Sequence, residues 1–148
     1  MRSDDSEEIA RHSAKELAEK FKKNIVVEDS GLFIKALNDF PGTYSATVHK
    51  KIGLEGILKL MKNVKDRECE YKSAVAFCEP EKKPISFLGT EKGKIAESIR
   101  GNFGFGHDPI FIPDGRSKTY GEMKNVEEIK KFRRMAVLKL RVYLLNKK

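Results

Sequence analysis

The chain has 148 residues, of which 35% are charged and 39% are apolar, and its formal net charge is +8. This length suits one domain with a buried core, and the composition is that of a globular chain, which excludes a disordered or fibrous protein. No stretch approaches the roughly 20 apolar residues that a membrane-spanning helix needs, and the first residues lack the apolar run of a secretory signal. We therefore expect a cytoplasmic protein with no membrane contact that forms a single domain over residues 1–148.

The positive charge is spread along the whole chain. A positive field attracts polyanions, a class that includes both nucleic acids and nucleoside triphosphates. Many glutamates accompany the lysines, so the charge alone does not favour a nucleic acid as the partner. The two cysteines, Cys69 and Cys78, are too few for a disulfide scaffold and lack the spacing of metal ligands, so we expect both to be reduced.

The first predicted element is a helix over residues 6–22. Ser6 can cap its N-terminus, and the acids Glu7 and Glu8 in the first turn interact favourably with the helix dipole. Small and apolar residues recur at spacings of three and four and so share one face. They are Ile9, Ala10, Ser13, Ala14, Leu17 and Phe21.

A short apolar strand, residues 25–27, follows this helix and ends at the segment Glu-Asp-Ser-Gly of residues 28–31. A strand that delivers two acids to a glycine turn is a common place for the chemistry of α/β enzymes. Pro41 and Gly42 then break the chain before two predicted helical segments, residues 44–49 and 52–61.

The middle of the chain has the pattern of a sheet. Residues 71–78 and 85–88 read as strands, and residues 90–99 continue the sheet. A glycine-rich loop, residues 101–106, follows, and the last helix runs from about residue 126 to residue 145. Its apolar stripe consists of Ile129, Phe132, Ala136, Leu140 and Leu144. Because helices and strands are interspersed, the predicted class is α/β, with a mixed central sheet flanked by helices.

Three segments contain the residues that can carry chemistry. The first is VEDSGLF at residues 27–33, followed by FPGTYSA at residues 40–46; the second is RGNFGFGHDPIF at residues 100–111; the third is KTYGEM at residues 118–123. In this order and at this spacing they resemble the inosine/xanthosine triphosphate pyrophosphatase family. That family hydrolyses non-standard purine nucleoside triphosphates to the monophosphate and pyrophosphate with magnesium, and the resemblance extends over nearly the whole chain.

The resemblance implies that Asp29 binds the metal or acts as the general base. Hydrolysis of a phosphoanhydride needs a divalent cation, an acid that holds it or activates water, and cations that bind the leaving group. The alternative is that Asp29 only caps the following turn, and Glu28 is expected to support the site. The Ser30 hydroxyl and the Gly31 amide could contact phosphate, and Lys15 matches the family's helix lysine that faces the triphosphate.

The same resemblance implies a base pocket in the glycine-rich loop. Phe105 matches the family's stacking aromatic, and Asp108 matches the aspartate near the purine edge. Gly106 and His107 lie between them, and His107 stands where the family usually has tyrosine or tryptophan. Arg133 matches an arginine of the last helix. Since an aromatic face accepts any purine, polar contacts to position six must distinguish inosine and xanthosine from adenosine.

Two departures from the family pattern affect the expected function. The family begins with a strand and a Thr/Ser-Gly-Asn-x-x-Lys loop that grips the phosphates, and we expect this fold to lack both. In the last helix, Lys131 and Phe132 replace a serine and a histidine, and a phenylalanine cannot hydrogen-bond a base carbonyl. The family's lysine of this region has no certain counterpart, although Lys130 is close.

We therefore expect a Mg²⁺-dependent pyrophosphatase that acts on ITP, dITP and XTP, with reduced activity, and that forms a homodimer as its relatives commonly do. The main alternative is a catalytically inactive paralogue or a fragment that binds nucleotide or a protein partner. A nucleic-acid-binding module is a third reading, which rests on the net charge of +8 and the basic last helix.

Overall fold

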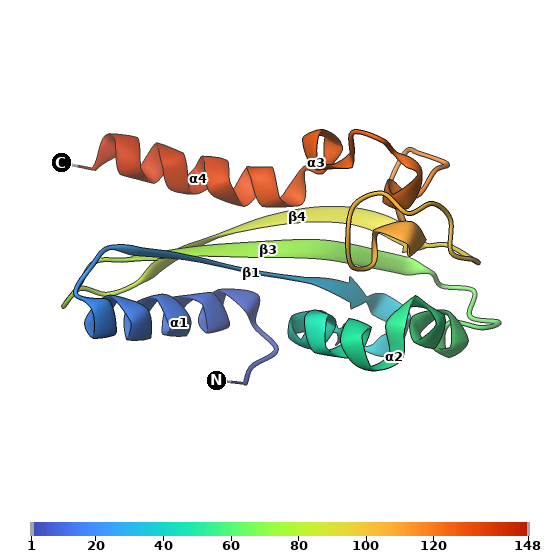
Figure 1. Cartoon of the computed structure of the whole chain (residues 1–148), viewed down its shortest axis with the longest axis horizontal. Coiled ribbons are helices and arrows are strands. Elements are labelled where there is room, and N and C mark those ends of the chain that lie inside the picture. The colour runs from blue at the N-terminus through green and yellow to red at the C-terminus, as the bar shows by residue number, and fades with distance from the viewer. Residues whose placement is uncertain (1, 148) are drawn as a thin grey trace. The chain divides into compact units, whose positions relative to one another are not determined.

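The computed structural model describes residues 2–147. They form an α/β fold in which helices pack on a five-stranded sheet with the strand order β2-β1-β3-β4-β5 (Figure 1). The β1–β2 and β4–β5 pairs are antiparallel. The predicted α/β class is confirmed.

The helices are α1 (Ser6–Phe21), α2 (Ser45–Leu60), α3 (Val126–Ile129) and α4 (Phe132–Asn146), and the strands are β1 (Ile25–Ile34), β2 (Phe40–Pro41), β3 (Glu68–Cys78), β4 (Ile85–Ile95) and β5 (Phe111–Pro113).

The described residues group into two compact units. Unit 1 contains the residues up to 30, residues 72–90 and the residues from 131 on, whereas unit 2 contains residues 31–71 and 91–130. The boundaries fall inside β1, β3 and β4, so each long strand contributes one part to each unit. The single domain over residues 1–148 stays a prediction.

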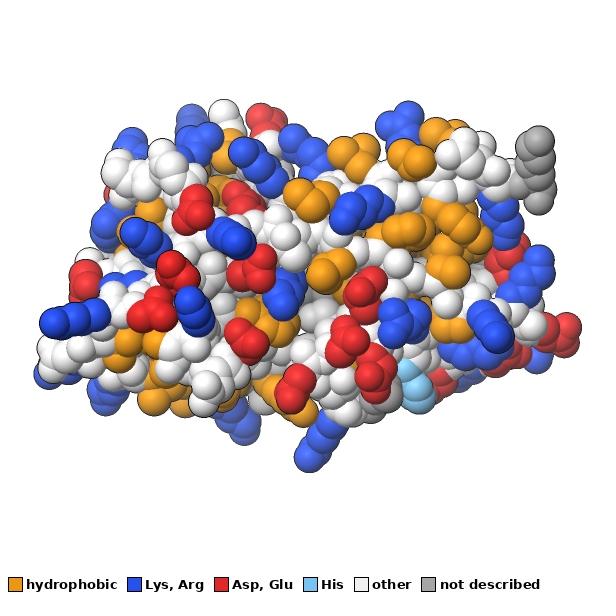
Figure 2. Space-filling view, turned by 180° about the vertical axis from the view of Figure 1, so that it is seen from behind, with side chains coloured by type: hydrophobic (Ala, Val, Ile, Leu, Met, Phe, Trp, Pro, Cys, Tyr) orange, Lys and Arg blue, Asp and Glu red, His pale blue; other side chains and the backbone are white. Residues whose placement is uncertain are grey.

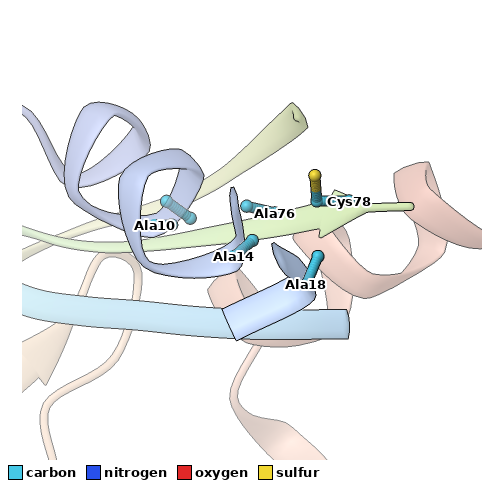
Figure 3. Packing of buried hydrophobic residues seen from close by; sticks show 6 residues of the cluster. Ala10, Ala14, Ala18, Ala76 and Cys78 are labelled. Atoms are coloured by element: carbon cyan, nitrogen blue, oxygen red, sulfur yellow. The ribbon is translucent and has the colours of Figure 1, made fainter. Parts of the chain in front are cut away.

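Small side chains let α1 lie close to β3 in unit 1. Ala10, Ala14 and Ala18 recur every four residues, so they form one stripe along the helix, and all three are fully buried. They pack against β3, where Ala76 and Cys78 face them (Figure 3). Because an alanine side chain ends at Cβ, helix and strand approach closely. The predicted apolar face is confirmed at Ala10 and Ala14, but it omitted Ala18 and wrongly included Phe21, which is 53% exposed.

The other face of the same strand is covered by α4. Val75 and Phe77 alternate with the residues that face α1, so their side chains point to the opposite side of the sheet. Ala136 and Leu140 of α4 pack on them there. Unit 1 therefore has three layers, with α1 and α4 on opposite faces of the strands (Figure 1).

A glycine in β4 allows the first turn of α4 to approach the sheet. A Cβ atom at Gly89 would overlap the carbonyl oxygen of Phe132 and would lie 2.8 Å from the backbone nitrogen of Ala136. Both contacts are with backbone atoms, which cannot rotate away. The position of Gly89 thus determines where α4 begins, and with it the position of Arg133.

The first strand is longer than the sequence pattern predicts. We expected it to end at a glycine turn, but β1 continues through Gly31 to Ile34. A Cβ atom at Gly31 would overlap the carbonyl oxygen of Gly42, so the glycine serves a close approach of two backbone segments. The Ser45 hydroxyl accepts a hydrogen bond from the Leu32 N–H at 2.8 Å on the same edge of the strand.

Helix boundaries also differ from the predicted ones. Residues 44–49 and 52–61 were expected as separate helical segments. The element α2 spans both, and its backbone is non-helical at Gly53, where φ is 65° and ψ is −168°, so the expected break is present and lies at Gly53. The single last helix that we predicted is divided into α3 and α4. At Lys130 the backbone leaves the helix, with φ −56° and ψ 129°. The strands β2 and β5 were missed because they have only two and three residues.

Acidic and basic side chains are interspersed over the face in Figure 2, and hydrophobic ones gather near the C-terminal end of α4. Within α4, Val142 is 58% exposed and Leu145 is 73% exposed. Within residues 2–147, no helix combines the length and the apolar character needed to cross a membrane.

The packing of α4 on β4 makes a testable prediction. Gly89→Ala should lower the free energy of unfolding by about 3 kcal/mol, because the added methyl group displaces the backbone of α4. Thr90→Ala in the same strand is the control and should cost about 1 kcal/mol or less. Urea denaturation of both variants measures the difference, and equal small losses would show that α4 tolerates displacement from β4.

Candidate active site

The alternation of β1 separates the two predicted acids. Successive side chains of a strand point to opposite faces, so Asp29 shares a face with Val27, and Glu28 shares the other face with Ser30. Val27 packs against the alanine stripe of α1. Asp29 therefore lies on the α1 side of the strand, whereas Glu28 and Ser30 lie on the α4 side.

Asp29 is a half-buried carboxyl group with an unsatisfied oxygen. Its Oδ2 atom is buried and has no hydrogen-bond partner among residues 2–147. Burial raises the pKa of Asp29 to about 6, and the neighbouring charge of Glu28 contributes to the rise. A buried carboxylate oxygen without a donor is costly unless a cation or a donor binds there, and a pKa near neutrality suits proton transfer.

On the opposite face of β1, an arginine and two hydroxyl groups surround Glu28. The Ser73 hydroxyl donates to its Oε2 at 2.6 Å, and Arg133 Nε donates to the same oxygen at 3.1 Å. Arg133 Nη2 also donates to the Ser30 hydroxyl oxygen at 3.3 Å. The structure thus brings the predicted residues Ser30 and Arg133 together and pairs Glu28 with Arg133, and the supporting role of Glu28 stays a prediction.

Lys15 projects from α1 toward the connection between β3 and β4. Its ammonium group donates to Glu19 at 2.8 Å and to the carbonyl oxygen of Lys82 at 2.9 Å. The hydrogen bond with Glu19 raises the pKa of Lys15. These contacts are separate from those of Ser30 and Arg133, so the contact of Lys15 with a triphosphate stays a prediction.

The carboxyl groups of unit 1 are compatible with a Mg²⁺ site that has one or two protein ligands. Within residues 2–147, no three His, Cys, Asp or Glu side chains are grouped as metal ligands. Mg²⁺ does not require such a group, because it usually binds one or two carboxylates and completes its shell with water and substrate phosphates. The unpartnered Oδ2 of Asp29 fits one such ligand.

In unit 2, the glycine-rich loop ends at Asp108, which is fully buried. Its Oδ2 accepts a hydrogen bond from the Phe105 N–H at 3.0 Å and lies 2.5 Å from Lys130 Nζ. Its Oδ1 accepts a hydrogen bond from the Tyr71 hydroxyl at 2.8 Å. A buried carboxylate needs such donors, and they tie the loop to β3 and to the residue between α3 and α4.

Phe105 is 57% exposed, although its backbone is held by Asp108. Lys130 Nζ lies 4.2 Å from the centroid of its ring, which is the geometry of a cation–π contact. Gly104 has φ +74°, and a Cβ atom there would overlap the Asp108 carboxylate. The loop therefore presents an aromatic ring at the surface, as a base-stacking role requires, while Gly106, with φ +60°, has open space around it.

His107 lies in the interior of unit 2. It is 5% exposed, and its ring meets His49 edge-on at a centroid distance of 5.0 Å. Burial lowers the pKa of His107 to about 4, and His49 contributes to the lowering. Its ring is therefore neutral at pH 7. We expected His107 to line the base pocket, but its side chain is buried in unit 2. Its contact with a base stays a prediction.

Two residues that contact Asp108, Lys130 and Tyr71, were not predicted as site residues from the sequence. Lys130 lies next to the position where a lysine was expected, but a continuous helix was predicted there. Tyr71 had no local signal, because it is 37 residues from Asp108 in the sequence. Phe132, which replaces a histidine of the family, is 3% exposed and packs at the start of α4.

Comparison with known proteins identifies relatives over most of the chain. The sequence profile of the Ham1 family matches residues 2–143. The dITP/XTP pyrophosphatase of Methanopyrus kandleri is 52% identical over 86% of this chain and 68% of its own length. The dITP/XTP pyrophosphatase of Methanothermobacter marburgensis is 47% identical over 90% of this chain and 71% of its own length.

Solved structures agree with this relationship. The HAM1 protein of Coxiella burnetii has a TM-score of 0.87 and 27% identity, over 98% of this chain and 79% of that protein. The Staphylococcus aureus Ham1 protein has a TM-score of 0.81 and 31% identity, over 90% of this chain and 73% of that protein. These findings confirm the predicted fold and the resemblance seen in the sequence. The chain belongs to the Ham1 family.

Proposed function

We propose that the chain hydrolyses the non-standard purine nucleoside triphosphates ITP, dITP and XTP to the monophosphate and pyrophosphate, with Mg²⁺. The observation that carries the proposal is the 52% identity to a dITP/XTP pyrophosphatase over 86% of this chain. The two groups of residues support it, because one has the chemistry of phosphate hydrolysis and the other has the chemistry of purine recognition.

The phosphate chemistry is assigned to unit 1. The reaction adds water across the anhydride bond between the α- and β-phosphates, so a base must accept a proton from the water. Asp29 suits this role or that of a cation ligand, because its pKa is about 6 and its Oδ2 has no partner within residues 2–147. Mg²⁺, when bound with the triphosphate, supplies neutralisation of the phosphate charge.

The resemblance also assigns Arg133 and Ser30 to the substrate, although both lie on the face of β1 opposite to Asp29. A guanidinium group and a hydroxyl group both donate to phosphate oxygens, and the two lie 3.3 Å apart. Glu28 holds the guanidinium group in place at 3.1 Å. The contacts of Lys15 and of the Gly31 amide with phosphate, implied by the resemblance, belong to the same proposal.

The base chemistry is assigned to unit 2. Phe105 offers a ring for stacking, and Asp108 and Lys130 place a carboxylate and an ammonium group close to it. A six-oxopurine has a carbonyl acceptor at position six and an N–H donor at position one, whereas adenine has the reverse order. A carboxylate acceptor at the purine edge, which the resemblance implies for Asp108, complements the N1–H of inosine and xanthosine, which adenosine lacks.

The assembly and the cellular location also belong to the proposal. The resemblance implies a homodimer with a purine nucleoside triphosphate as the ligand, and the cytoplasm is the location expected from the sequence. Light scattering of the purified protein measures its oligomeric state directly.

The first prediction concerns turnover. Pyrophosphate release with Mg²⁺ should be faster from ITP and XTP than from GTP and ATP. Asp29→Asn should lower kcat about a hundredfold or more, because an amide neither accepts the proton nor holds the cation as a carboxylate does. Asp66→Asn, at an exposed acid, is the control and should leave kcat unchanged.

Two outcomes would contradict this assignment. Unchanged turnover in Asp29→Asn would remove Asp29 from the catalytic role. A folded protein that binds ITP and releases no pyrophosphate would favour the catalytically inactive nucleotide-binding protein over the enzyme.

The second prediction concerns acid stability. The folded state holds the pKa of His107 near 4, below its ordinary value of 6.5, so the neutral ring is the form that the fold stabilises. This stabilisation is complete above pH 6.5 and is lost as the pH falls from 6.5 to 4, with a total of roughly 3 kcal/mol.

His107→Phe removes the titrating ring and keeps an aromatic side chain. Its free energy of unfolding should therefore fall less than that of the wild type between pH 7 and pH 4. Urea denaturation at pH 7, 5.5 and 4 measures how the free energy of unfolding of each protein changes with pH. Identical pH dependence of the two proteins would show that His107 does not cause the loss of stability in acid.

A further inference from the structure

Tyr71 is the donor that reaches the second oxygen of the Asp108 carboxylate. The two oxygens of this fully buried group are bound differently. Oδ2 receives the Phe105 N–H and faces Lys130, whereas Oδ1 receives the Tyr71 hydroxyl at 2.8 Å. A carboxylate held at one oxygen can still rotate about its Cβ–Cγ bond, but one held at both oxygens has a fixed plane.

The ring of Tyr71 is itself held in one orientation. It stacks on Phe111 with a centroid distance of 4.0 Å and an interplanar angle of 18°. Phe111 in turn stacks on Tyr120 at 5.5 Å and 8°. Tyr71 is 7% exposed, so its hydroxyl cannot turn toward solvent without breaking this stack.

The hydroxyl contributes something that the ring does not. A phenylalanine ring would fill the same space in the stack, and it would avoid the cost of burying a polar group. The cost of burying the hydroxyl is offset by its hydrogen bond to the Asp108 carboxylate, because hydrogen bonds to charged groups are among the stronger kinds in proteins. Burial, followed by the nearby charge of Asp108, raises the pKa of Tyr71 well above its usual value, so the group remains a donor at neutral pH.

Through Asp108, this contact reaches the loop that we assign to the base. The oxygen Oδ2 can accept the Phe105 N–H only while the carboxylate plane is correctly set. That hydrogen bond fixes the backbone of the residue whose ring is 57% exposed. Tyr71, which is 7% exposed, thereby influences the orientation of Phe105 through Asp108.

We propose that Tyr71 is a positioning residue for purine recognition: its hydroxyl orients the Asp108 carboxylate, and the carboxylate holds the loop of residues 103–108 so that Phe105 is presented to the base. The expected effect of Tyr71 on turnover rests on the proposed function. The expected effect of Tyr71 on the order of the loop does not depend on that function. This chain of contacts lies within unit 2, whereas Asp29, Ser30 and Arg133 belong to unit 1.

The test is Tyr71→Phe, which keeps the aromatic stack and removes one hydroxyl group. With ITP and Mg²⁺, KM should rise on the order of tenfold while kcat stays within about twofold, because the variant loses a charge-assisted hydrogen bond on the base side. Tyr143→Phe in α4 removes the same group outside the base loop and should change neither parameter.

A second readout follows the loop without turnover. Amide hydrogen exchange of Phe105 should become at least about tenfold faster in Tyr71→Phe, with the amides of β3 unchanged. If the wild-type protein does not hydrolyse ITP, the proposed function fails, and this exchange measurement still decides the role of Tyr71. An unchanged Phe105 amide would overturn the proposal, and so would an equal loss of protection throughout the chain.

Discussion

A buried ion pair between Asp108 and Lys130 organises the segment around the glycine-rich loop of unit 2. The two charged atoms lie 2.5 Å apart, and the side chains are 1% and 3% exposed. Removing Lys130 would leave the Asp108 carboxylate buried without its counter-ion, and breaking a buried ion pair typically costs about 3–5 kcal/mol. Lys130 Nζ also lies 3.2 Å from the Glu127 carboxylate. Because Tyr71 and the Phe105 N–H donate to the same Asp108 carboxylate, this group joins the loop, the first half of β3 and the segment between α3 and α4.

Two aspartates of the chain have opposite environments, and this difference separates their roles. Asp29 is half-buried with an oxygen that has no donor within residues 2–147, so its pKa is raised and it can exchange a proton or take up a cation. Asp108 receives three donors and serves as a fixed acceptor. Enzymes with two carboxyl groups often divide their chemistry in this way, by environment rather than by residue type.

Local pattern was sufficient for the features that depend on nearby residues. The periodicity of residues 6–22 predicted a helix with Ala10 and Ala14 on its buried face, and the order of the motifs led to the family. Tertiary contacts decided the rest. Gly31 was expected in a turn, but it lies within a strand. A glycine is needed there because the backbone of Gly42 approaches it closely, and the sequence around Gly31 gives no sign of that contact. The last helix was predicted as continuous because Lys130 leaves it to reach a carboxylate on another segment, which helical periodicity cannot reveal.

A double-mutant cycle on the ion pair tests this account most directly, with Asp108→Asn, Lys130→Met and the combined variant compared by urea denaturation. The account predicts that each single change lowers the free energy of unfolding by about 3–5 kcal/mol and that the double variant loses clearly less than their sum. It also predicts faster hydrogen exchange at Phe105 in both single variants. Additive losses, with Phe105 protected as in the wild type, would contradict the claim that this pair holds the loop.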